Sequence, residues 1–295
     1  MQLENDLYGI DKKLLIKAGH VIDSRVLDNI AGLSGRISYV RIKDTPLIKD
    51  IIQAFKDKRY SNIFFRQDTN LKIVHYISHL TMPEKILSEL AHMKKMSLYT
   101  YHHILIIAIL ATKISLEDSQ KNKYSPEMAS RLSLFHDLGK TRIPLRILNK
   151  RSPLTRQERC ILRTHPLIGY VLLHYYFGKD HKQYDFSSFQ HHEKLDGSGY
   201  PLGIKRINKY SHLIGIVDTL DALISDRPYR KNPFTLRAAI DYLLEESEKG
   251  KFHKGLIRIL IRYSRKEGPA TKLIIGERGR DKEPTGNFYG KTATA

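Results

Sequence analysis

The sequence lacks the features that would place the protein outside the cell or within a membrane. It has a single cysteine, Cys160, which excludes an internal disulfide and agrees with a reducing cytoplasm. No run of about eighteen apolar residues occurs, and the stretch from Ile104 to Leu110 is too short to cross a bilayer. Residues 1–10 carry acids and lack the basic-then-apolar layout of a signal peptide. We therefore expect a cytoplasmic protein without a transmembrane segment.

Acidic side chains are scarce relative to basic ones. The chain has 50 lysines and arginines against 31 aspartates and glutamates, which gives a formal net charge of +19. This charge predicts an anionic partner such as a phosphate substrate, a nucleic acid or a membrane surface, and a basic surface without a specific ligand is the alternative. The excess is greatest over residues 251–283, where no series of aromatic residues interleaves with the basic ones. A specific nucleic-acid groove is therefore not expected.

The N-terminal residues are predicted to form a small α/β module. Ser24 is a candidate cap for a helix, and residues 37–42 alternate like a strand, so residues 1–42 contain both element types. A length of 295 residues suits one large or two ordinary domains, and the 41% hydrophobic fraction supports a buried core.

The following segment, residues 45–96, is predicted to be helical. Pro46 and Pro83 lie near predicted helix starts, where a proline is well tolerated. The polar residues 66–70 interrupt the pattern and are predicted to form a linker. We assign residues 1–96 to an N-terminal regulatory module.

From residue 97 onward, one predicted helix follows another. Ser125 and the proline after it mark a helix start, and a capping box begins at Thr155. The helix after Thr155 is predicted to end at His165 and the proline that follows. We assign residues 97–265 to a catalytic domain and residues 266–295 to a basic, disordered tail.

The chain does contain a spaced set of side chains that bind metals. The set has five imidazoles and two carboxylates: His103, His136, Asp137, His165, His191, His192 and Asp218. Successive groups are separated by about one helix and a turn, so a helical scaffold can direct all of them to one point. Five imidazoles and two carboxylates suit two adjacent divalent ions, because a carboxylate can bridge a pair of ions.

The sequence motifs around these residues resemble those of a known family. Residues 136–140 read HDLGK, residues 191–201 read HHEKLDGSGYP, and residues 225–231 read SDRPYRK. In this order they resemble the HD-GYP family, bacterial phosphodiesterases that degrade cyclic di-GMP. The resemblance implies a mainly α fold, in which an HD-type helical bundle follows the small α/β module. It also implies hydrolysis of cyclic di-GMP to pGpG by a hydroxide that bridges two metal ions.

The resemblance implies two ions that share Asp137. The first ion is assigned to His103, His136, Asp137 and Asp218. The second ion is assigned to Asp137, His165, His191 and His192. Iron or manganese is expected, and zinc also suits this donor set.

The first histidine has a neighbour that competes for the same role. His102 and His103 are adjacent, and the spacing from Tyr99 to His103 resembles the family pattern and favours His103. Some family members carry a glutamate at the position of Tyr99 that supports a third ion. Because a phenol is a poor ligand for these ions, we predict two ions here, and the product is left open between pGpG and GMP.

The resemblance also assigns residues to the substrate. Lys140 would add positive charge beside the phosphate, and Tyr200 would face the ligand, where a guanine can stack on its ring. Arg227 and Arg230 are spaced to face the same way on a helical turn, and their guanidinium groups suit phosphate or guanine. The alternatives are an exposed lysine, a tyrosine packed in the core and a solvated basic surface.

The loop that carries Tyr200 has its own conformational signals. The residues predicted to shape it are Asp196, Gly197, Gly199 and Pro201. The two glycines permit tight or left-handed backbone, and the proline restricts the preceding residue to extended angles.

The sequence therefore supports a leading hypothesis and several alternatives. The leading one is a metal-dependent cyclic di-GMP phosphodiesterase, because every residue of the two-metal set is present. The alternatives are a non-catalytic cyclic di-GMP receptor or adaptor, a phosphodiesterase for another cyclic dinucleotide, and a basic nucleic-acid binder. The sequence leaves open a homodimer and a protein signalling partner.

Overall fold

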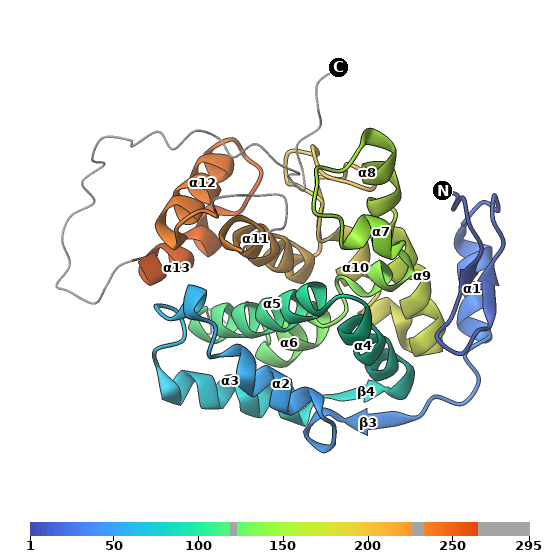
Figure 1. Cartoon of the computed structure of the whole chain (residues 1–295), viewed down its shortest axis with the longest axis horizontal. Helices are drawn as coiled ribbons and strands as arrows, with labels where there is room; N and C mark the ends of the chain where they lie inside the picture. The colour runs from blue at the N-terminus through green and yellow to red at the C-terminus, as the bar shows by residue number, and fades with distance from the viewer. Residues whose placement is uncertain (119–122, 226–232, 265–295) are drawn as a thin grey trace.

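The computed structural model describes residues 1–118, 123–225 and 233–264, and the fold is mainly helical, as predicted (Figure 1). The α-helices are α1 (Ser24–Gly32), α2 (Leu47–Ala54), α3 (Gln67–His79), α4 (Glu84–Met96), α5 (Leu98–Glu117), α6 (Pro126–Ser133), α7 (Leu145–Leu148), α8 (Arg156–Leu162), α9 (His165–Phe177), α10 (Phe186–Gln190), α11 (Lys209–Ile224), α12 (Leu236–Glu248) and α13 (Lys254–Ser264). Short 3-10 helices are η1 (Ile42–Asp44), η2 (Lys58–Tyr60), η4 (Leu138–Arg142) and η5 (Gly178–Gln183). Arg227, Arg230 and the tail over residues 266–295 lie outside the described residues.

Two small antiparallel sheets form the β part of the fold. The strands are β1 (Leu7–Tyr8), β2 (Leu14–Ile16), β3 (Tyr39–Arg41) and β4 (Thr81–Pro83). Strand β1 pairs with β2, and β3 pairs with β4. Helix α1 packs against α9 and η5 at the side of the bundle (Figure 1). Its cap is Asp23, whose carboxylate accepts a hydrogen bond from the Val26 N–H at 2.9 Å, and the predicted cap at Ser24 was wrong by one residue.

Two predicted helix boundaries were wrong, for different reasons. Residues 66–70, predicted as a linker, mostly belong to α3, because Ile73 and Ile77 one turn apart anchor that helix in the core. His165 does not end a helix but begins α9, with the proline in its first turn, where its missing N–H is not needed. The predicted cap at Ser125 and the capping box of Thr155 are confirmed.

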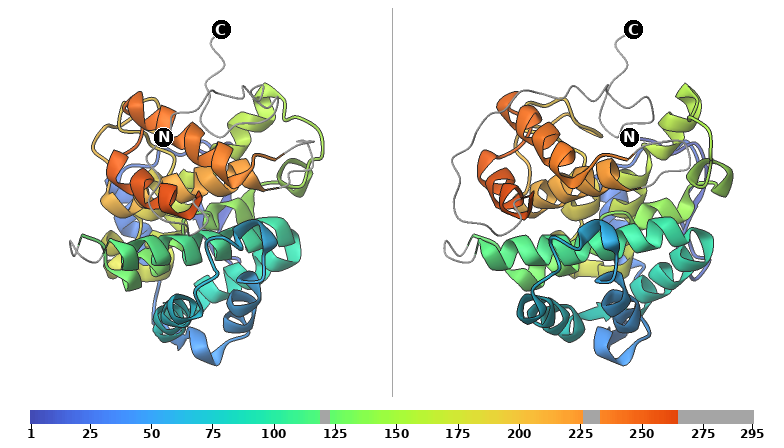
Figure 2. Two further views of the ribbon diagram at one scale, coloured as in Figure 1. Left: turned by 90° about the vertical axis from the view of Figure 1, so that its left-hand side faces the viewer. Right: turned by 60° about the vertical axis from the view of Figure 1, so that its left-hand side comes forward.

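Helix α5 is the central helix of the molecule. It packs against α4, α6 and α11, and it lies between helices α2 and α3 on one side and the α11–α13 group on the other (Figures 1 and 2). By length and composition alone it is apolar enough to cross a membrane, and it is the single such helix among the described residues. In the structure 83% of that apolar window is buried inside the protein, as in the core helix of a bundle.

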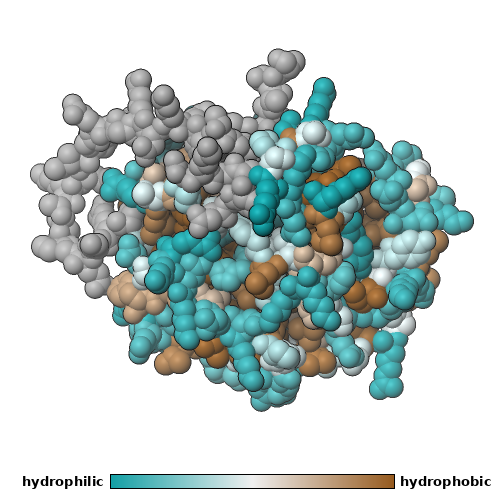
Figure 3. Space-filling view, viewed as in Figure 1, coloured by the Kyte–Doolittle hydropathy of each residue, from teal (hydrophilic) through white to brown (hydrophobic). Residues whose placement is uncertain are grey.

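The hydrophobic core is one continuous cluster that runs from Leu3 to Tyr263. The predicted boundary near residue 96 stays a prediction, since residues from both sides of it share this core. On the face drawn in Figure 3, hydrophilic side chains cover most of the described surface, and hydrophobic residues show as separate patches. The polar residues that concern function lie inside, where α5, α9 and α11 approach the α6–η4 turn.

Candidate metal centre

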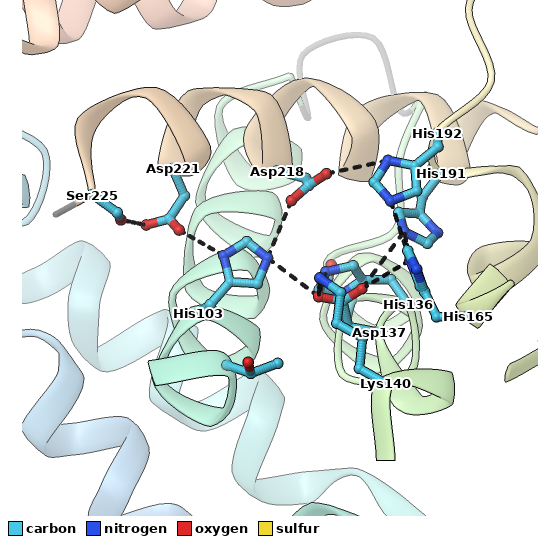
Figure 4. A network of polar contacts seen from close by, with 12 residues as sticks. His103, His136, Asp137, Lys140, His165, His191, His192, Asp218, Asp221 and Ser225 are labelled. Atoms are coloured by element: carbon cyan, nitrogen blue, oxygen red, sulfur yellow. Dashed lines mark hydrogen bonds and ion pairs between the residues drawn. The ribbon is translucent and has the colours of Figure 1, made fainter. Parts of the chain in front are cut away.

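The structure brings all seven predicted metal-binding side chains together. His103 comes from α5, His136 and Asp137 from the turn between α6 and η4, and His165 from the first residue of α9. The other three are His191 and His192, directly after α10, and Asp218 on α11. Each of the seven is at most 5% exposed, and their polar ends point toward one another in Figure 4.

The seven side chains form two groups joined by Asp137. One group is His103, His136 and Asp218, and the other is Asp137, His165, His191 and His192. Oδ2 of Asp137 lies 3.5 Å from Nε2 of His103 and 3.4 Å from Nε2 of His136. Oδ1 lies 3.3 Å from Nε2 of His165 and 3.7 Å from Nε2 of His191. Each oxygen of this carboxylate therefore faces a different pair of imidazoles, which is the arrangement of a bridging ligand.

Backbone hydrogen bonds set the tautomer of three of the histidines. His136, His165 and His191 each donate from Nδ1 to the carbonyl three residues earlier, at 2.6, 2.7 and 2.7 Å. A carbonyl can only accept, so the proton is on Nδ1 and the lone pair of the neutral ring is on Nε2. Nε2 of His165 lies 3.4 Å from Nε2 of His191, so two lone pairs face each other. This arrangement is repulsive unless a cation lies between them.

Several buried polar atoms of the centre lie near other polar groups but make no hydrogen bond within the described chain. Nε2 of His103, Nε2 of His136 and Oδ1 of Asp137 make no hydrogen bond, and leaving such atoms buried and unpaired is unfavourable. The separations between donor atoms, from 3.1 to 3.7 Å, are close to the roughly 3.3 Å edge of a tetrahedron with 2.0–2.1 Å bonds. The residues present thus fit divalent ions that accept nitrogen and oxygen donors.

Burial and charge keep most of these groups in the form that binds metal. Burial lowers the pKa of His165 to about 4 and holds the pKa of His191 and of His192 well below the ordinary value. Burial alone would raise the pKa of Asp137, but nearby groups, of which the positive charge of Lys140 has the largest effect, hold this pKa well below its usual range. Neutral imidazoles and an ionised carboxylate are the states that coordinate metal.

His103 differs from the other histidines because a second carboxylate holds it. Burial would lower its pKa, but the charges of Asp221 and Asp218 raise it to about 9. Its Nδ1 donates to Oδ2 of Asp221 at 2.6 Å, which directs Nε2 toward the centre. The Asp221 carboxylate also accepts hydrogen bonds from the hydroxyls of Tyr60 and Ser225. This half of the centre therefore attracts positive charge.

Sequence reasoning missed Asp221 and its partners. Asp221 lies three residues after Asp218 on α11, so the spacing along one helix face was an available signal. No comparable signal pointed to Tyr60, which lies in η2 within the N-terminal segment. His102, the competitor of His103, points elsewhere: its Nε2 lies 3.7 Å from Asp57.

The loop after the two histidines packs directly against them. Tyr200 is buried, and its ring stacks on His192 with centroids 4.6 Å apart, while the Arg163 guanidinium lies 4.6 Å from its ring centre. The predicted left-handed backbone is present at Gly197, with φ of 85°. Glu193, which sequence reasoning also missed, accepts hydrogen bonds from backbone N–H groups of the loop at 2.7 and 3.1 Å. The contact of Tyr200 with substrate stays a prediction.

Comparison with known proteins shows the family to which the chain belongs. The sequence model of the HD domain family matches residues 85–254. The chain belongs to the HD domain family. The "Cyclic di-GMP phosphodiesterase response regulator RpfG" of Xanthomonas campestris pv. campestris is 40% identical over 119 residues, which cover 40% of this chain and 30% of that protein. "Cyclic di-GMP phosphodiesterase PA4108" of Pseudomonas aeruginosa is 33% identical over 160 residues, 52% of this chain and 37% of that protein.

A third relative is named for another cyclic dinucleotide. The "3'3'-cGAMP-specific phosphodiesterase 1" of Vibrio cholerae is 29% identical over 175 residues, 57% of this chain and 38% of that protein. The chain spans less than half the length of each of these three relatives. The HD-GYP resemblance expected from the motifs is confirmed by these HD domain relatives.

Proposed function

We propose that this chain is a metal-dependent phosphodiesterase that hydrolyses cyclic di-GMP to pGpG. The observation that carries the proposal is the pair of opposed imidazole groups that share Asp137, in which His136, His165 and His191 direct lone pairs rather than protons at the centre. Relatives named as cyclic di-GMP phosphodiesterases support the substrate. The net charge of +19 suits a dinucleotide that carries two phosphates.

Two divalent ions would be held by the two groups of ligands, with the carboxylate of Asp137 shared. Iron and manganese are the first candidates, and zinc also suits the imidazole-rich donor set. When bound, such a pair polarises phosphoryl oxygens and makes hydroxide available near neutral pH. The burial of the ligands keeps competing water away from them.

The residues of the chain itself would bind and orient the substrate. Lys140 is buried with its ammonium group on Asp137, so its positive charge lies beside the place where a phosphate would enter. Asp221 fixes the orientation of His103, and Glu193 holds the loop that carries Tyr200. Arg227 and Arg230, outside the described residues, remain the proposed contacts for phosphate or guanine.

A second substrate has support of its own. The relative named for 3'3'-cGAMP matches 57% of this chain, which makes a mixed cyclic dinucleotide the other candidate. Both substrates have the same phosphodiester ring, so the metal centre does not distinguish them. The distinction must come from contacts to the bases.

To test this activity, metal-replete protein is incubated with cyclic di-GMP or with 3'3'-cGAMP. The products are then separated by chromatography. We expect Asp137→Ala to abolish turnover while binding of the dinucleotide persists in part. His102→Ala, which changes the adjacent histidine outside the centre, is the matched control and should keep turnover. Wild-type protein that binds the dinucleotide but releases no product with manganese or iron would favour the receptor hypothesis instead.

A further inference from the structure

A second cluster of metal-binding side chains lies outside the seven-residue centre. His174 is on α9, His181 is in η5, and Asp185 directly precedes α10. One donor atom of each lies within 4.8 Å of the others, and the three side chains are 2%, 6% and 8% exposed. The proposed phosphodiesterase reaction uses none of them.

We propose that His174, His181 and Asp185 bind a further divalent ion, with zinc as the first candidate. Oδ2 of Asp185 lies 2.9 Å from Nδ1 of His181 and 3.6 Å from Nε2 of His174. The second separation lies within the range found between donor atoms in the seven-residue centre, and the first is a hydrogen-bond distance. Two imidazoles and a carboxylate form a complete three-residue zinc donor set, with a fourth position for water.

The hydrogen bonding of His174 leaves a lone pair directed at the carboxylate. Its Nδ1 donates to the Tyr170 carbonyl at 2.9 Å, so the proton of the neutral ring is on Nδ1. Burial lowers the pKa of His174, which favours that neutral ring. A lone pair on Nε2 then faces the Asp185 carboxylate without a proton between them. A cation in this position removes the repulsion.

Asp185 is placed as a helix cap but does not act as one. Aspartate is favoured at this position because its side chain accepts from the N–H groups of the first turn. Here the side chain makes no such hydrogen bond with α10, and its carboxylate faces the two imidazoles instead. Asp28 on α1 is close enough to favour positive charge at His174.

The location suggests what the ion would do. His165 and His174 are on the same helix, about 14 Å apart at 1.5 Å per residue. Asp185 precedes α10 and His191 follows it, and α10 is tied to the α6–η4 turn by the Ser188 hydroxyl, which donates to the His136 carbonyl at 3.0 Å. An ion at the cluster would fix the ends of α9 and α10 that lie away from the seven-residue centre.

The test counts zinc in full-length protein that has been loaded with zinc and freed of loosely held ions by gel filtration. We expect three ions per chain in the wild type and two in His181→Gln, with folding checked by circular dichroism. Asp185→Asn is a second variant with the same expectation. Asp180→Asn, which changes an exposed acid nearby, is the matched control and should keep three ions.

The possible results either support or overturn the proposed site at His174, His181 and Asp185. Two or fewer ions in the wild type, or three ions in a folded His181→Gln or Asp185→Asn protein, overturn the proposal. If neither variant folds, anomalous diffraction at the zinc edge from wild-type crystals decides. A peak in contact with His174 and Asp185 then supports the site, and the lack of a peak there overturns it.

Discussion

At the residue scale, the candidate metal centre depends on which nitrogen of each imidazole carries the proton. The sequence predicted all seven side chains that converge, because their motifs are distinctive. It could not predict the tautomers, since these depend on carbonyl groups one turn earlier and on Asp221. Tyr60 was missed because no sequence signal links the N-terminal segment to the centre, whereas Asp221 was missed although it lies three residues after Asp218 on the same helix.

Asp221→Asn is expected to weaken metal binding. The amide can no longer accept the Nδ1 proton as a charged partner, so His103 loses both its orientation and part of its basicity. Changes to such supporting residues typically lower metal affinity by about 10–100-fold. Competition with a coloured chelator measures the affinity, and Asp241→Asn at an exposed ion pair serves as control. An unchanged affinity in Asp221→Asn would show that Asp221 does not support the centre.

Gly139→Ala is expected to disrupt the centre through the backbone. A Cβ atom at this position would lie 2.0 Å from the His165 carbonyl oxygen and 2.6 Å from the Gly169 nitrogen. The first turn of α9 would have to move, and His165 would move with it. We expect loss of bound metal and a lower melting temperature. Gly32→Ala, where a Cβ meets no atom within 4 Å, should change neither measurement appreciably.

At the scale of elements, a buried ion pair joins three parts of the bundle. Glu89 on α4 is fully buried and pairs with Arg142 at the end of η4. The Tyr176 hydroxyl of α9 donates to the same carboxylate. Arg142 also donates from Nε to the carbonyl of Tyr8 at 2.9 Å, so β1 is tied to the same point. The pair therefore fixes the α6–η4 segment, which carries His136 and Asp137, against its neighbours.

Arg142→Ala should destabilise the fold strongly because it leaves the Glu89 carboxylate buried without its cation. Removing one partner of a buried pair typically lowers the free energy of unfolding by about 3–5 kcal/mol. Urea denaturation followed by circular dichroism measures it. Arg237→Ala breaks the exposed pair with Asp241 and should change the stability by less than about 1 kcal/mol. Equal effects of the two substitutions would contradict this role for Glu89.

At the scale of the whole molecule, the N-terminal segment is part of the same core as the bundle. Tyr60 reaches the candidate metal centre, and Asp11 pairs with Lys85 of α4 and accepts from the Tyr175 hydroxyl of α9. Sequence patterns identified the separate elements, through the cap at Ser125 and the capping box of Thr155. They could not predict how distant segments pack, so the start of α3 and the first residue of α9 were assigned incorrectly.

The Asp11 contacts predict a pH dependence of stability. Burial would raise the pKa of Asp11, but hydrogen bonds from Lys85 and Tyr175 lower it to about 2, below the roughly 3.9 of an unfolded chain. The stabilisation is therefore complete above about pH 4 and is lost as the pH falls toward 2. In urea denaturation of metal-free protein, Asp11→Asn should be less stable than the wild type at pH 6, with a smaller difference at pH 3. A difference that does not shrink, or one matched by the exposed control Asp44→Asn, would contradict this origin.

The central claim is that two ions share the carboxylate of Asp137, and anomalous diffraction from manganese-loaded crystals tests it most directly. The account predicts two peaks about 3.5–4 Å apart, each in contact with one oxygen of Asp137. One peak should also touch His103 and Asp218, and the other His165 and His191. A single peak, or two peaks of which neither contacts Asp137, would contradict the account.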